Sequence, residues 1–135
     1  MEPRYLLDTN TIISIRRQTP VSVREAFGKL QQGEAIVSVI TYGELRYGVS
    51  KSSRKEAAIG TLREMMQILP LTPLPGAAGA IYGEIRAELE AKGKIIGNND
   101  LWIAAHALAS GLILVTNNER EFRRVKGLKI QNWVA

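Results

Sequence analysis

A short apolar run, Tyr5-Leu6-Leu7, ends abruptly at the carboxylate of Asp8, which is followed by Thr9 and Asn10. Apolar side chains at consecutive positions are typical of a strand buried on both faces, as in parallel sheets covered by helices. Asp8 would then stand at the carboxyl end of a central strand. Ligands bind along that edge in open α/β sheets, so the sequence predicts a functional site there.

The rest of the chain alternates between apolar runs and helical patterns. Further strands are predicted at residues 35–40, 68–71, 112–116 and 128–131, with helices over 12–17, 22–33, 41–49, 53–68, 75–93 and 98–111. Strands that alternate with helices indicate a mostly parallel sheet of four to five strands in a three-layer α/β/α sandwich. We expect a single domain over residues 1–135, a length that buries enough surface for independent stability.

Composition narrows the classes of function. The chain has no cysteine, so disulfides, thiolate zinc sites and thiol nucleophiles are excluded. It has no apolar run of about 20 residues that would span a bilayer, and no signal-peptide core at the N-terminus. We therefore expect a cytoplasmic protein. The formal net charge of +5 favours a polyanionic partner, although only weakly.

Several acidic residues follow predicted strands and should converge at one edge of the sheet. Asp8 follows the first strand, Glu44 lies one turn into the helix after the second, and residues 117–121 (Asn-Asn-Glu-Arg-Glu) follow the strand at 112–116. Asp100 lies in the first turn of a predicted helix and can face the same edge. The carboxyl ends of parallel strands share one edge, so these groups can form one site.

Each acid also has a structural alternative. Glu44 fits a capping box that begins at Thr41, Asp8 could cap the following helix, and Asp100 could complement a helix dipole. Glu119 and Glu121, taken singly, are more typical of solvated side chains. Three further residues have structural interpretations, His106 in mid-helix and the packing groups Trp102 and Trp133.

Acids gathered in one cleft require compensation. Two like charges about 4 Å apart repel by about 4 kcal/mol at an effective dielectric near 20. Hard oxygen ligands without thiols favour Mg²⁺ or Mn²⁺, which can activate water and bind a phosphate oxygen. Basic residues could then track a nucleic-acid backbone around the acidic centre, or form a solvated face; they are Arg16, Arg17, Arg46, Arg120, Arg123, Arg124 and Lys126.

Four motifs in order resemble the PIN-domain toxins of VapBC toxin–antitoxin modules. They are residues 6–10 (LLDTN), 41–45 (TYGEL), 96–105 (IGNNDLWIAA) and 115–122 (VTNNEREF). The likeness continues to the closing Gly127-Leu128 and Asn132-Trp133. One such motif would be a weak signal, but four in register over essentially the whole chain are specific.

The resemblance implies a set of site residues. Asp8, Glu44 and Asp100 match the family's three metal-binding acids. Many members carry a fourth acid where this chain has Asn118, a neutral ligand at best, and the form of the last motif indicates that Glu121 supplies that acid instead. Two further residues, Asn10 and Thr116, match positions that orient the first acid and its water.

The resemblance also implies a function. The family expectation is a type II toxin, a Mg²⁺- or Mn²⁺-dependent endoribonuclease that leaves a 5′-phosphate and a 3′-hydroxyl and inhibits translation. A VapB-type antitoxin would neutralise it, and it would usually be a homodimer. The subgroup resembles toxins that cut initiator tRNA in the anticodon loop, which makes that tRNA the leading substrate.

Two other classes of function remain open from the residues. An Asp after the first strand also suits response-regulator receivers and haloacid-dehalogenase-like phosphatases, although receivers need an acidic pair before it and the phosphatases usually need Asp at the position of Asn10. The second alternative is a nucleic-acid-binding or antitoxin-titrating module without catalysis, which Asn118 would favour if it leaves the metal site incomplete.

Overall fold

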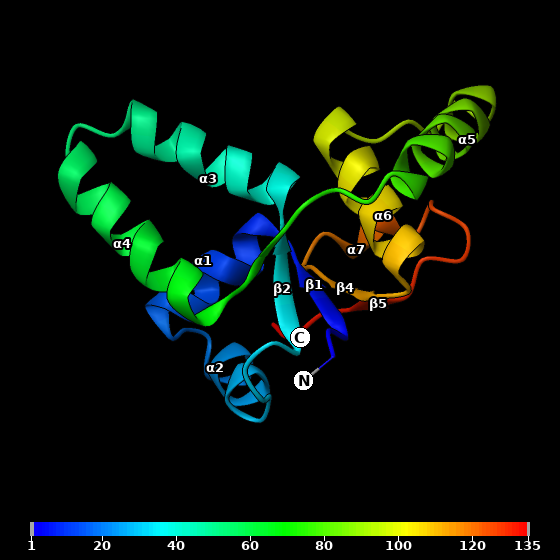
Figure 1. Ribbon diagram of the computed structural model, residues 1–135. Coiled ribbons are helices and arrows are strands. Elements are labelled where there is room, and N and C mark those ends of the chain that lie inside the picture. The colour runs from blue at the N-terminus through cyan, green and yellow to red at the C-terminus, as the bar shows by residue number, and fades with distance from the viewer. Residues whose placement is uncertain (1, 135) are drawn as a thin grey trace.

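Five parallel strands form one sheet in the computed structural model, which describes residues 2–134 (Figure 1). The strand order is β3-β2-β1-β4-β5, so the first strand lies at the centre, as predicted. The strands are β1 (Tyr5–Leu7), β2 (Ala35–Ser38), β3 (Leu71–Thr72), β4 (Ile113–Val115) and β5 (Ile130–Gln131). In register, Leu7 of β1 pairs with Val115 of β4, and Asp8 continues the pairing by donating its N–H to Val115 O.

Helices cover both faces of the sheet. They are α1 (Thr9–Arg17), α2 (Val21–Gly28), α3 (Val39–Lys51), α4 (Lys55–Ile68), α5 (Ala77–Ala91), α6 (Asn98–Ser110) and α7 (Glu119–Phe122). Figure 1 shows α5 and α6 on one side of the sheet and α1, α2 and α4 on the other. The predicted three-layer α/β/α sandwich is confirmed.

The alternation of β1 explains the two layers. Leu6 points into a core that includes residues of α5 and α6, whereas Tyr5 and Leu7 point into a core that includes residues of α1, α2 and α4. Successive side chains on a strand face opposite sides, so a run that is apolar throughout needs cover on both. No helix within residues 2–134 is long and apolar enough to cross a bilayer.

Helix starts differ from the capping boxes predicted from spacing. β2 ends at Ser38, two residues before the predicted end, and the Ser38 hydroxyl accepts the N–H of Ile40, which starts α3 at Val39. Thr41 therefore lies inside the helix and does not cap it. Similarly α2 starts after Pro20, and the Ser22 hydroxyl donates to Val134 O. The same helix ends at Gly28, since Gly33, with φ of +95°, forms the turn into β2.

Candidate active site at the carboxyl edge of the sheet

Asp8 lies at the carboxyl end of the central strand and is buried. It is the N-cap of α1, and its Oδ1 accepts the backbone N–H of Thr11 at 3.0 Å. The structural alternative for Asp8 is therefore correct as far as it goes, because the residue does cap a helix. Capping uses only part of the carboxylate's capacity, since each oxygen carries two lone pairs.

Thr116, at the end of the neighbouring strand, holds the other oxygen of Asp8. Its buried hydroxyl donates to Asp8 Oδ2 and accepts the N–H of Asn118 at 2.9 Å. The Thr11 hydroxyl donates to Val115 O at 3.2 Å and joins the start of α1 to the end of β4. The carboxylate of Asp8 is thus oriented by groups from both sides of the β1–β4 pair.

Glu44 reaches the same edge from α3. Because α3 begins at Val39, Glu44 lies in the second turn, and the capping-box alternative for this residue is wrong. Its Oε1 accepts the hydroxyl of Thr9 at 3.0 Å. Glu44 is therefore tied to the residue directly after Asp8, which brings the first two acids to adjacent points of the edge.

Asp100 is the group on which the other acids converge. Its pKa is raised to about 6, first by burial and then by the negative charges of Glu121, Glu44 and Asp8, in that order of effect. Complementing a helix dipole would lower this pKa, so the dipole is not what dominates at Asp100. Glu121, Glu44 and Asp8, although distant in sequence, therefore all lie near enough to Asp100 to raise its pKa.

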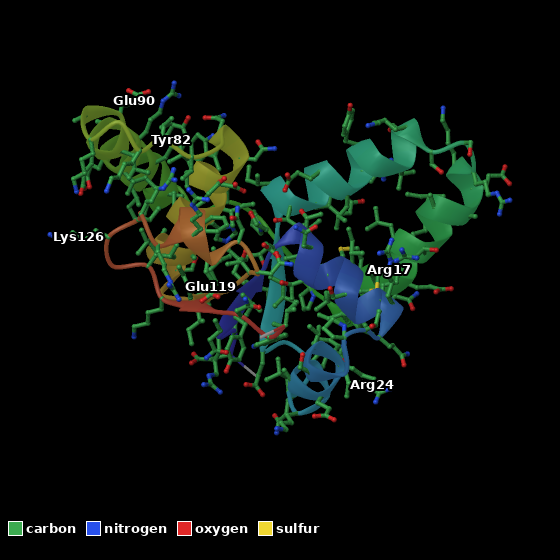
Figure 2. The ribbon with its side chains drawn as sticks, turned by 180° about the vertical axis from the view of Figure 1, so that it is seen from behind. Arg17, Arg24, Tyr82, Glu90, Glu119 and Lys126 are labelled. Carbon is green, nitrogen blue, oxygen red and sulfur yellow. The ribbon has the colours of Figure 1, made fainter. Side chains whose placement is uncertain are left out.

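Glu121 lies on the short helix α7, which the sequence patterns did not predict, and Asn118 directly precedes this helix. Asn118 is its N-cap residue, with no capping hydrogen bond from the side chain, and Glu121 is partly buried. The helix is anchored by buried Phe122 and by Glu119, which accepts hydrogen bonds from Asn132 and Arg123, both at 3.0 Å. Figure 2 shows Glu119 beside the C-terminal strand. Glu119 thus remains partly exposed to solvent, as expected, and its hydrogen bond from Asn132 also ties α7 to the C-terminal segment.

The donor set fits a hard divalent cation. A hollow of about 400 Å³ is lined by Glu44, Gly97, Asn98, Asn99 and Asp100. These residues offer carboxylate, side-chain amide and backbone carbonyl oxygens as possible ligands. Within residues 2–134, no three acidic or histidine side chains are close enough to form a ready coordination set. A cation bound among the acids would remove the repulsion that the other three exert on the carboxylate of Asp100.

The remaining predicted positions are less central. Asn10 is exposed on α1, and in the described residues its neighbours Thr9 and Thr11, rather than Asn10, make the hydrogen bonds to Glu44 and Asp8. The N–H of Thr11 is the ordinary partner of an N-cap carboxylate, so the possible cap at Asp8 was the available signal for it, whereas the bond from Thr9 to Glu44 joins distant elements and has no local signal. Trp102 stacks on Tyr82 with ring centroids 3.8 Å apart, and Trp133 meets Tyr5 edge-on, as expected of packing groups.

The basic residues do not gather in one ring. Figure 2 shows Arg17 and Lys126 at opposite sides of the molecule. Arg123 pairs with Glu119, and Arg124 donates to Ile95 O in the loop before α6. Arg123 and Arg124 therefore contact the segments that surround the acids.

The part of the chain that matches known proteins includes all four acids. A family model described as PIN domain matches residues 5–128, a span that contains all four acids. Ribonuclease VapC2 of Haemophilus influenzae is 42% identical over 131 residues, which are 97% of this chain and 98% of the relative. The tRNA(fMet)-specific endonuclease VapC of Shigella flexneri is 41% identical over 130 residues, 96% of this chain and 98% of its own.

A solved structure agrees in fold. VapBC2 from Rickettsia felis, bound to a DNA fragment from its promoter, contains a chain that matches with a TM-score of 0.88 and 41% identity. The match covers 96% of this chain and 98% of that one.

Proposed function

The chain belongs to the PIN-domain family, within its group of VapC ribonucleases, and from that premise we propose that it is the toxin of a type II toxin–antitoxin module. Its activity is the hydrolysis of phosphodiester bonds in RNA. The observation that carries the proposal is the convergence of Asp8, Glu44, Glu121 and Asp100 at one edge, with the pKa of Asp100 raised to about 6.

The proposed cofactor is Mg²⁺ or Mn²⁺, held by Asp8, Glu44, Asp100 and Glu121. When bound, such an ion supplies Lewis acidity that activates water and polarises a phosphate oxygen. The protein's part is orientation. The hydroxyl of Thr116 and the N–H of Thr11 fix the carboxylate of Asp8, and the hydroxyl of Thr9 fixes that of Glu44. Attack of water at phosphorus with loss of the 3′ oxygen leaves a 5′-phosphate and a 3′-hydroxyl.

The proposed substrate is initiator tRNA, cut in the anticodon loop, which would inhibit translation. The name of the Shigella flexneri relative supports it, since that protein is a tRNA(fMet)-specific endonuclease. A single-stranded loop also offers a phosphodiester that is free to enter an acidic hollow, whereas paired RNA presents a rigid backbone.

The proposed partner is a VapB-type antitoxin. The related structures from Rickettsia felis and Salmonella typhimurium are VapBC complexes bound to DNA. A homodimer within such a complex stays a prediction from the family. The receiver and phosphatase alternatives lose their support through PIN-domain membership, and a module without catalysis is disfavoured because the relatives are named ribonucleases.

The decisive experiment compares the wild-type chain with Asp8→Ala on a panel of tRNAs in Mg²⁺, in Mn²⁺ and in EDTA. We expect wild type to cut initiator tRNA in either metal and not in EDTA. The variant should be slower by more than about 100-fold, since residues that only support metal ligands are already worth 10–100-fold.

Circular dichroism of the Asp8→Ala chain checks that the variant is folded. We expect it to be folded, because loss of the helix cap costs only about 1 kcal/mol. Cleavage in EDTA at the rate seen in Mg²⁺ would refute the metal dependence. Equal rates for both chains would remove Asp8 from the mechanism.

A further inference from the structure

His106 is a fully buried side chain in the middle of α6, and it makes one hydrogen bond to a distant element. Its Nδ1 lies 2.8 Å from the hydroxyl oxygen of Ser38, which is also fully buried. Ser38 is the last residue of β2 and the N-cap of α3, where it accepts the N–H of Ile40 at 3.2 Å. The bond therefore joins the middle of α6 to the starting point of α3.

Packing alone does not account for an imidazole at this position. Within the described residues, His106 Nε2 is buried without a hydrogen-bond partner. Burial lowers the pKa of His106 and so favours the neutral form of the ring. A buried polar atom without a partner costs stability, and an apolar side chain of similar volume avoids that cost. The hydrogen bond between His106 Nδ1 and Ser38 is thus the feature that distinguishes histidine from an apolar residue at this position.

The two helices joined by this bond carry two of the four acids. Glu44 lies six residues after Ser38 on α3, and His106 lies six residues after Asp100 on α6. Each acid is therefore about 9 Å along a rigid helix from the bond. Glu44 is tied to Thr9 at 3.0 Å, so the position of α3 is fixed near the acid and again at its N-terminus.

We propose that His106 is a positioning residue, whose hydrogen bond to Ser38 sets the separation of α3 from α6 and so of Glu44 from Asp100. The inference rests on the proposed function, because this separation matters only if both carboxylates hold the same divalent ion. A shift of α6 relative to α3 would leave RNA binding intact and would weaken the ion's coordination.

The test compares three variants with wild type. His106→Leu removes the bond and also the unpartnered nitrogen. His106→Asn keeps a polar atom bonded to Cγ, at the place of Nδ1, and removes the atom at Nε2. Thr41→Val is the matched control. Thr41 Oγ1 lies on α3, is likewise buried without a hydrogen-bond partner among residues 2–134, and takes no part in the bond.

Each chain is examined by its melting temperature, by Mn²⁺ titration calorimetry, and by kcat and KM for tRNA cleavage. We expect His106→Leu to melt close to wild type, because removal of the unpartnered nitrogen offsets the loss of the hydrogen bond to the buried Ser38 hydroxyl. It should nevertheless lose roughly tenfold in kcat and in Mn²⁺ affinity, at unchanged KM. His106→Asn should melt lower than His106→Leu because it leaves a cavity, but should keep kcat and Mn²⁺ affinity close to wild type. Thr41→Val should change neither kcat nor Mn²⁺ affinity.

This opposite order of stability and activity is what a merely structural role cannot produce. If the wild-type chain is active and His106→Leu has the same kcat and Mn²⁺ affinity, the inference about His106 is overturned, but the proposed function is not. The inference also fails if His106→Asn loses as much of both as His106→Leu. A wild-type chain that neither binds Mn²⁺ nor cuts RNA would overturn the proposed function, and this inference with it.

Discussion

Asp8 receives its two hydrogen bonds from opposite ends of the sequence. Thr11 lies three residues away, whereas Thr116 is separated from it by most of the chain. A carboxylate held on both oxygens has one orientation before any ligand arrives, and preorganisation of this kind is what supporting residues contribute at metal sites.

Removal of the Thr116 hydroxyl should lower both stability and activity. Thr116→Val leaves Asp8 Oδ2 and the N–H of Asn118 without their partner. We expect a loss of about 1–3 kcal/mol in the free energy of unfolding and a fall of roughly 10–100-fold in RNA cleavage. Urea denaturation and a tRNA cleavage assay measure the two effects. Thr116→Ser, which keeps the hydroxyl, should behave like wild type, and an equally impaired Ser variant would contradict the assignment.

The raised pKa of Asp100 predicts a pH-dependent cost to stability in the metal-free chain. Its pKa is about 6 in the folded state against 3.8 ordinarily, so the folded state favours the protonated form. The stabilisation by this group is fully present below pH 3.8 and is lost as the pH rises through about 6. Asp100→Asn stays neutral and escapes the loss.

In EDTA, Asp100→Asn should therefore be more stable than wild type at pH 7.5 by about 1–2 kcal/mol, after allowance for solvent screening. The advantage should disappear below about pH 4, where Asp100 is protonated in both states. Denaturant titrations across this range measure it. A constant difference at all pH values would show that the carboxylate charge is not its cause.

The elements that carry the acids could be predicted to different degrees. β1, β4 and the long helices follow from hydrophobic periodicity, and motif order placed Asp8, Glu44 and Asp100. The start of α3 was misplaced, since spacing alone cannot tell the Thr41–Glu44 capping box from the true cap at Ser38. The bond from His106 to Ser38 spans 68 positions and has no local signal.

The short helix α7 decides which residue completes the acidic site. An isolated four-residue helix is unstable in water, so its position depends on Phe122 and on the Glu119–Asn132 bond. Glu121 is the largest of the three charge effects on Asp100, whereas Asn118 serves the turn through its backbone N–H. The negative charge that Glu121 brings near Asp100 supports the proposal that Glu121 is the fourth ligand.

Separate substitutions of Glu121 and Asn118 test which of the two residues is the fourth ligand. Glu121→Gln should reduce RNA cleavage by roughly 10–100-fold and weaken Mn²⁺ binding, while Asn118→Ala should leave both within a few-fold of wild type. Parallel cleavage assays and calorimetry provide the comparison. The reverse ranking would assign the fourth position to Asn118.

For the whole molecule, the ion should act as a cross-link between elements. Asp8 precedes α1, and α3, α6 and α7 carry Glu44, Asp100 and Glu121, so a bound cation would connect all four helices and remove the repulsion at Asp100. At a concentration of 100 times its dissociation constant, a ligand of the folded state adds about 2.7 kcal/mol of stability. We expect Mn²⁺ to raise the melting temperature by about 10 °C at that concentration.

Glu44→Gln is the comparison for this effect. It removes one negative charge, so it should melt higher than wild type in EDTA and respond less to Mn²⁺ at the same concentration. Differential scanning calorimetry measures both. An identical metal-induced shift in the two chains would mean that Mn²⁺ binds elsewhere.

The central position of β1 has a consequence for synthesis. β1 is made first, but its neighbour β4, the donor Thr116 and the acid Glu121 come near the end of the chain. A ribosome translating this message thus carries a nascent chain whose first acid has no fixed orientation and whose fourth does not yet exist. RNA cleavage is therefore expected only of a chain that extends through β4 and α7, and we expect a chain that stops before β4 to be inactive.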